Sequence, residues 1–121
     1  MMSEKKQTKE IKIKLNYYKS KSDKENGVYF GGVVEPKYTN ELKISIADDY
    51  EFDMDSEDFK KNGMYALEIS GSNRALKELG KFLINISMFK TEDDDYHEHI
   101  DMIKDSTGNP MVNVTIRKEN Q

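Results

Sequence analysis

The sequence predicts an α+β fold, in which a mostly antiparallel β-sheet of five to seven strands is packed by one amphipathic helix. Several short segments alternate apolar and polar residues, which is the pattern of a strand with one buried face. Only one segment, residues 72–89, repeats its apolar residues at helical spacing. Strands and helices do not alternate along the chain, so neighbouring strands are expected to pair antiparallel rather than through helical crossovers.

Two strands are predicted in the N-terminal part of the chain. Residues 11–17 alternate Ile, Leu and Tyr with Lys and Asn, and residues 19–27 follow as a polar loop that ends in the Asn-Gly turn signal. Residues 28–34, VYFGGVV, form the second strand. Gly31 and Gly32 interrupt it, and a glycine pair inside a strand predicts a bulge, a bend or the close approach of another backbone.

The middle of the chain predicts two further strands and a possible edge strand between them. Residues 42–46 and 65–69 each alternate large apolar residues with polar or small ones, so one face of each strand is expected to be buried. Residues 50–54 alternate Tyr50, Phe52 and Met54 with acids. This intervening segment is expected to be an edge strand with an acidic outer face.

The helix and two final strands complete the predicted order β-β-β-(β)-β-α-β-β. Ser72 is a suitable helix N-cap, because its hydroxyl can accept a hydrogen bond from a free amide of the first turn. Residues 96–103, YHEHIDMI, and residues 111–118, MVNVTIRK, are predicted strands, with a turn at residues 106–110. The Tyr96, Ile100 and Met102 side chains are expected to face the core.

A chain of 121 residues fits one domain. We assign that domain to residues 10–118 and treat residues 1–9 as a flexible polar tail. The absence of cysteine excludes thiol chemistry and fits a reducing compartment. No segment approaches the roughly 20 apolar residues of a membrane span, and we expect no signal peptide and a cytoplasmic location.

The acidic residues are concentrated in two short windows. The net charge is −4, which argues against nucleic acid as a partner, because phosphate binding needs clustered Lys and Arg. Thirteen of the 23 acids lie in residues 48–58 (the first acidic window) and 92–101 (the second acidic window), and neither window contains Lys or Arg. Such windows indicate either a solvated surface or recognition of a basic partner, with Tyr50 and Tyr96 as candidate anchors.

Both histidines of the chain lie in the second acidic window. In a strand His97, His99 and Asp101 would project to one face, where two imidazoles and a carboxylate could bind a metal ion or orient a general base. A structural zinc site, however, normally has four protein ligands, and the chain has no cysteine or third histidine to complete one. A solvated or partner-contacting face therefore remains the favoured interpretation, with no cofactor expected.

The C-terminal half also resembles a known class of proteins. The segments YALEISGS, NRALKELGKFLINI, YHEHID and MVNVTIRK follow one another between residues 65 and 118. This order resembles the small immunity proteins encoded beside polymorphic toxins in bacteria. The resemblance implies a protein that binds and silences a cognate toxin, often an enzyme with a basic substrate-binding face.

These observations together predict a non-enzymatic acidic protein that neutralises a basic protein partner, with a bacterial toxin as the leading candidate. One alternative is a small metal-binding protein or metal-dependent enzyme that uses the HEHID strand. Another is a phage or mobile-element protein that sequesters a host factor or small ligand, with a concave pocket near the glycine pair. The predicted partner-binding residues are Asp48, Asp49, Tyr50, Glu51, Asp53, Asp94, Asp95, Tyr96, His97, Glu98 and His99.

Overall fold

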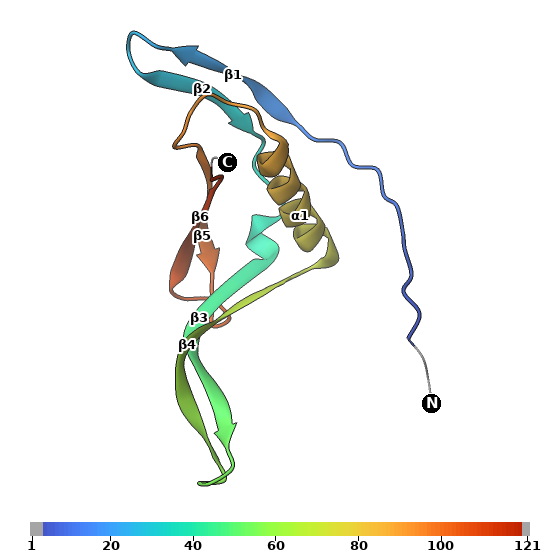
Figure 1. Cartoon of the computed structure of the whole chain (residues 1–121), viewed down its shortest axis with the longest axis vertical. Helices are drawn as coiled ribbons and strands as arrows, with labels where there is room; N and C mark the ends of the chain where they lie inside the picture. The colour runs from blue at the N-terminus through green and yellow to red at the C-terminus, as the bar shows by residue number, and fades with distance from the viewer. Residues whose placement is uncertain (1–3, 120–121) are drawn as a thin grey trace.

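The computed structural model describes residues 4–119, which contain six strands, one α-helix and a short 3₁₀ helix (Figure 1). Strands β1 and β2 form a two-stranded sheet, and the other four form a sheet in the order β4-β3-β5-β6. The α+β class is therefore confirmed, although the strands divide between two sheets. The elements are β1 (Tyr17–Asp23), β2 (Val28–Val33), η1 (Thr39–Glu41), β3 (Leu42–Asp53), β4 (Asp58–Gly71), α1 (Asn73–Met88), β5 (His97–Lys104) and β6 (Met111–Arg117).

The first strand lies later in the chain than its sequence pattern predicts. Residues 11–16 are outside any strand, and β1 begins at Tyr17 and runs through residues that were predicted to be a loop. The prediction was wrong because β2 pairs with residues 17–23, from Tyr17↔Val33 to Asp23↔Val28, and alternation alone supplies no partner for residues 11–16. The turn at Gly27 is confirmed, with φ at 64°.

The glycine pair allows β1 and β2 to approach closely. The register shifts between Tyr18 and Lys21, opposite Gly31, and a Cβ on Gly31 would lie 2.6 Å from the Lys19 carbonyl oxygen. Gly31 also has φ at 97°, which disfavours a side chain there. The predicted bulge and close backbone approach are both confirmed.

Strands β3 and β4 form one long antiparallel hairpin that projects from the rest of the molecule (Figure 1). The predicted strand at residues 42–46 and the edge strand at residues 50–54 are a single strand, because β3 continues to Asp53. The register shifts between Asp48 and Tyr50, and the extra residues lie on β4 around Gly63, which has φ at 81°. We call this hairpin the ribbon.

The ribbon joins the remaining strands only at its base. Strand β3 pairs in parallel with β5 through Lys43↔Lys104, and β5 pairs antiparallel with β6. A bulge after Ile100 places Met102 at φ 62° with 65% of its surface exposed, while Ile103 is 1% exposed. Met102 was therefore wrongly predicted to face the core, since one extra residue in β5 reverses the alternation.

Helix α1 covers the base of the ribbon and forms the core with the neighbouring strands. Ser72 caps it as predicted, since the Ser72 hydroxyl accepts a hydrogen bond from the Ala75 N–H at 3.2 Å. The helix buries one stripe, although Leu76 and Leu83 at its edges remain more than 40% exposed. The buried apolar residues are Val33, Leu42, Ile44, Ala75, Phe82, Ile86, Phe89, Tyr96, Ile100 and Ile103.

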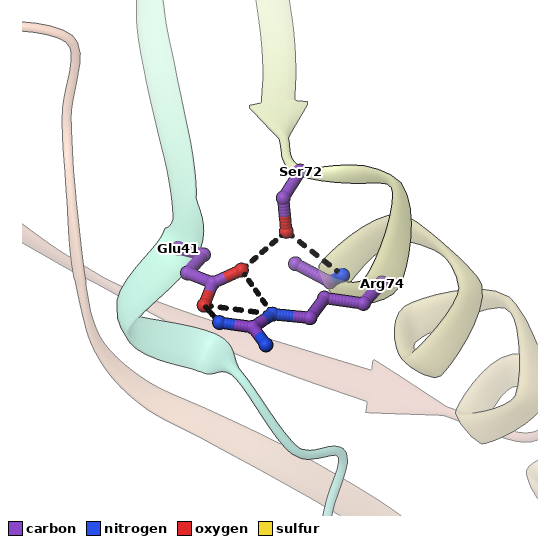
Figure 2. Close-up of polar contacts among 4 residues, drawn as sticks. Glu41, Ser72 and Arg74 are labelled. Atoms are coloured by element: carbon purple, nitrogen blue, oxygen red, sulfur yellow. Dashed lines mark hydrogen bonds and ion pairs between the residues drawn. The ribbon is translucent and has the colours of Figure 1, made fainter.

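A polar clamp fixes the start of β3 to the start of α1 (Figure 2). The Arg74 guanidinium donates to both Glu41 carboxylate oxygens, at 2.6 to 3.0 Å, and the Ser72 hydroxyl donates to the same carboxylate. Arg74 also lies over the Tyr38 ring, 4.3 Å from its centroid. The hydrogen bonds from Arg74 and Ser72 lower the pKa of the Glu41 carboxyl to about 2. The clamp therefore holds the helix entrance against the base of the ribbon.

The N-terminal segment stands apart from these elements. The predicted tail, residues 1–9, lies partly outside the described residues, and its flexibility stays a prediction, as does the domain boundary at residue 10. Residues 4–16 form no regular secondary structure. Asn16 is nevertheless anchored, because its carbonyl oxygen accepts hydrogen bonds from the buried Asn85 side chain at 2.7 Å and from the Val34 N–H at 3.0 Å.

Candidate partner-binding surface

The first part of the second acidic window, residues 92–96, lies in the loop between α1 and β5, and the rest of the window belongs to β5. Asp95 makes an ion pair with Arg117 of β6, and the Asp93 carboxylate accepts a hydrogen bond from the Asp95 N–H at 2.9 Å. Glu92 lies 3.6 Å from the Lys24 ammonium. Asp94 and Asp95 are exposed, whereas Asp93 is half-buried. The loop therefore presents acids to solvent in a shape held by its own hydrogen bonds.

Tyr96 and Glu98 face the interior of the molecule. Tyr96 is 7% exposed and packs on Phe89, and its hydroxyl donates to Glu98 Oε2 at 2.6 Å. The same oxygen accepts a hydrogen bond from the Val33 N–H at 3.0 Å. Burial and the Glu98 carboxylate raise the pKa of the Tyr96 hydroxyl far above its ordinary value. These two residues link β2 to β5, so we leave them out of the contact surface.

The two histidines lie together on the outer side of β5. Their ring centroids are 4.8 Å apart in an edge-to-face arrangement. His97 Nδ1 lies 2.7 Å from the Asp95 carbonyl oxygen, and His99 Nδ1 lies 3.2 Å from the Thr115 hydroxyl. Within residues 4–119 no three His, Cys, Asp or Glu side chains are grouped to hold a metal ion. His97, His99 and Asp101 thus share a region without forming a ligand set.

The first acidic window divides between the two faces of the ribbon. In an antiparallel pair, residues directly opposite each other project to the same face, and successive residues alternate between faces. The pairs Glu51↔Lys60 and Asp53↔Asp58 therefore lie on one face together with Asp49. We call this the acidic ribbon face. The ammonium of Lys60 on this face lies 2.9 Å from the Asp53 carboxylate. Hydrogen bonds from Lys60 and from the Asp55 N–H lower the pKa of the Asp53 carboxyl.

The opposite face of the ribbon carries large apolar side chains, most of which are exposed. Its residues include the directly opposed pairs Ile44↔Ile69, Ile46↔Leu67 and Phe52↔Phe59. Ile44 is buried at the base, but Ile46 is 63% exposed and Leu67 62%. The apolar ribbon face comprises the exposed residues Ile46, Tyr50, Phe52, Phe59, Tyr65, Leu67 and Ile69. Two of the predicted contact residues, Asp48 and Tyr50, lie on this face.

This apolar surface was missed by the sequence interpretation. The alternation at residues 42–46 and 65–69 predicted two buried faces, and the structure buries only the residues nearest α1. The reason is length, which the predicted strand at residues 65–69 did not reveal: a single helix of 16 residues spans about 24 Å, whereas the 14 residues of β4 span about 46 Å. One helix cannot cover such a strand from end to end.

The two acidic windows lie far apart, on opposite sides of the point where β3 meets β5 (Figure 1). Strands β3 and β5 run parallel and meet at Lys43 and Lys104, so β5 begins on one side of this junction and β3 ends on the other. At about 3.3 Å per residue, the strand residues between His97 and Asp53 span on the order of 50 Å. A partner that contacts both windows would have to extend over that distance.

The space beside the glycine pair is filled by the chain itself. A Cβ on Gly32 would lie 2.7 Å from Glu98 Oε2, just as one on Gly31 would meet the Lys19 carbonyl. A shallow hollow of about 160 Å³ lies nearby, lined by Glu35, Pro36, Thr39, His99, Ile100 and Asp101.

Among the described residues, α1 is too short and too polar to cross a membrane.

Comparison with known proteins gives one match. Residues 66–115 match the family model described as Immunity protein 32. The match begins in the half of β4 nearer α1 and continues through α1 and β5 into β6, so it contains the whole second acidic window. It confirms the resemblance of the C-terminal half to immunity proteins. Neither the curated proteins nor the solved structures include a significant match to the chain.

Proposed function

We propose that the protein is an immunity protein that binds a bacterial toxin in the cytoplasm and neutralises it without catalysis. The observation that carries this proposal is the match of residues 66–115 to the Immunity protein 32 family. A basic substrate-binding face on the toxin would complement the acids of this chain, and complementary charge accelerates encounter and fixes orientation. The toxin would then be silenced because its own binding face is covered.

The proposed contact surface is the exposed part of the second acidic window. Asp94, Asp95, His97 and His99 lie within the family match and at or near the surface, above the inward-facing Tyr96 and Glu98. Asp95 is already held by Arg117, so little side-chain ordering would be needed on binding. Asp49, Glu51 and Asp53 on the acidic ribbon face, far from this window, contribute to long-range attraction.

The test uses the toxin domain encoded beside the gene, with growth rescue on co-expression and association kinetics of the purified proteins. Asp94→Lys/Asp95→Lys is expected to slow association about tenfold or more at low salt, with a smaller effect at high salt. The matched control, Glu4→Lys/Glu10→Lys, makes the same change in net charge on exposed residues outside any helix or strand.

Three results would contradict the proposal. The toxin domain could fail to bind the unaltered protein at all. The Asp94→Lys/Asp95→Lys variant could associate with the toxin at the unaltered rate. Alternatively, this variant and the control could slow association equally, which would mean that only the net charge of the chain matters and not the position of these acids. Circular dichroism of each variant checks that the loss of the Asp95–Arg117 ion pair leaves the fold intact.

A further inference from the structure

The chain exposes more surface than a compact monomer of its size. Its accessible surface is 10470 Å², whereas a folded monomer of 14.1 kDa is expected to expose about 6,700 Å². Residues 4–16 account for part of the excess, and the projecting ribbon accounts for another part (Figure 1). A two-stranded ribbon with both faces in solvent is only marginally stable. The ribbon therefore has surface available to bury against a partner.

The apolar ribbon face is large enough for a stable interface. Tyr50, Phe52, Phe59 and Tyr65 are 49% to 78% exposed, and these four aromatic side chains alone leave on the order of 500 Å² uncovered. Ile46, Leu67 and Ile69 extend the patch toward the base of the ribbon. A standard interface buries about 800 Å² on each partner, and patches on ordinary monomers seldom exceed about 600 Å².

The charge on this face indicates what kind of partner it fits. Its charged residues at the first acidic window are Asp48 and Lys61, which form an ion pair at 3.0 Å and so cancel. The unbalanced acids Asp49, Glu51 and Asp58 lie on the other face of the same ribbon. A basic toxin would be attracted to that acidic face, whereas the apolar face has no electrostatic preference and suits a neutral apolar surface.

We propose that the apolar ribbon faces of two copies of this chain pack against each other in a two-fold symmetric dimer. A second copy supplies the required surface without further assumptions: it is neutral, apolar and of the same length. A two-fold axis near Tyr65, in the middle of the exposed part of this face, sets the ribbons antiparallel and keeps each tip clear of the helix on the other copy. The two acidic tips then point away from each other, which keeps their charges apart. The acidic ribbon faces and both copies of the second acidic window stay in solvent.

The experiment is sedimentation or light scattering of the full chain alone, which makes it independent of the proposed toxin. The unaltered protein is expected to have twice the mass of one 14.1 kDa chain. Leu67→Lys, which would bury an unpaired charge, is expected to weaken dimerisation about 100-fold or more. Ala66→Lys is the matched control, because Ala66 is exposed and lies on the opposite face in the adjacent position.

Each outcome distinguishes the occupant of the face. A dimer that Leu67→Lys and Ile46→Lys dissociate, and that Ala66→Lys does not, supports the proposal. An unaltered protein that is monomeric at every concentration overturns it. Equal loss of dimerisation in Ala66→Lys and Leu67→Lys would also overturn the proposal, and would indicate instead that two copies pair along the outer edge of β4. A monomer whose Leu67 variant alone loses protection against the toxin would assign the face to the toxin instead.

Discussion

The inner and outer halves of the ribbon have the same alternating sequence and opposite surroundings. Leu42 and Ile44 of β3 are 1% and 4% exposed, yet Ile46, the next residue on the same face, is 63% exposed. The change coincides with the limit of the cover that α1 provides, since Leu42 lies opposite Gly71, next to the start of the helix. Alternation in a strand thus indicates an apolar face, but the length of the covering element decides whether that face is core or interface.

The largest expected effect separates the covered part of the molecule from the ribbon. Phe82→Ala removes a ring that is 2% exposed in the core, and we expect it to lower the free energy of unfolding by about 3–5 kcal/mol. Phe59 on the ribbon is 65% exposed, so Phe59→Ala should cost less than about 1 kcal/mol in the monomer. Urea denaturation of both variants in the Leu67→Lys background measures this difference.

Similar losses in the two variants would contradict this contrast. They would mean that the ribbon contributes to the stability of the single chain as much as the core does. The Leu67→Lys background keeps the protein monomeric. In a dimer Phe59 would also stabilise the association, so the effect of Phe59→Ala on the free energy of unfolding of the single chain would be overestimated.

An intermediate effect is expected at the link between the two sheets. Glu98→Ala leaves the Tyr96 hydroxyl and the Val33 N–H without their acceptor in a half-buried place. We expect a loss of about 1–3 kcal/mol in the free energy of unfolding. Glu98→Gln is the control, since its amide oxygen can still accept both hydrogen bonds and should restore most of that loss.

Hydrogen exchange locates this effect. The β1–β2 hairpin should exchange faster in Glu98→Ala, while the outer part of the ribbon, which Glu98 does not contact, should exchange at its original rate. Faster exchange throughout the ribbon as well would show that the two regions do not open independently.

The smallest expected effect is a dependence on pH at the clamp. The pKa of Glu41 is about 2 in the folded protein, against an ordinary value of 4.5, so the unfolded state binds its proton first as pH falls. The contribution of the clamp is therefore complete above about pH 4.5 and is lost as pH falls through the folded pKa of about 2. Unfolding midpoints between pH 2 and 5 measure this contribution against Glu41→Gln, which should lack it. Parallel pH profiles would contradict the assignment.

The sequence predicted local structure better than the relations between distant segments. Alternation and capping located α1, β2, β5 and β6, because those signals depend on neighbouring residues. The first strand was misplaced because the choice between residues 11–17 and 17–23 depends on which segment β2 pairs with. The bulge that exposes Met102 could likewise not be predicted, because the extra residue in β5 is defined only by the register in which β5 pairs with β6.

The candidate site was predictable in its composition and less so in its geometry. The two acidic windows are evident from residue counts, but their separation depends on the parallel junction of β3 and β5. Alternation placed Glu98 on the face opposite His97 and His99, as observed. Its hydrogen bond to Val33, which lies 65 residues earlier, could not be inferred from local pattern.

The position of Glu98 beside Gly32 has a consequence for how this chain can evolve. The carboxylate occupies the space that any side chain at position 32 would need, with Oε2 2.7 Å from where a Cβ would lie. A substitution at either position therefore changes which residues the other can accept. In homologous sequences we expect the two positions to covary: a side chain larger than glycine at 32 should occur with a residue shorter than Glu at 98.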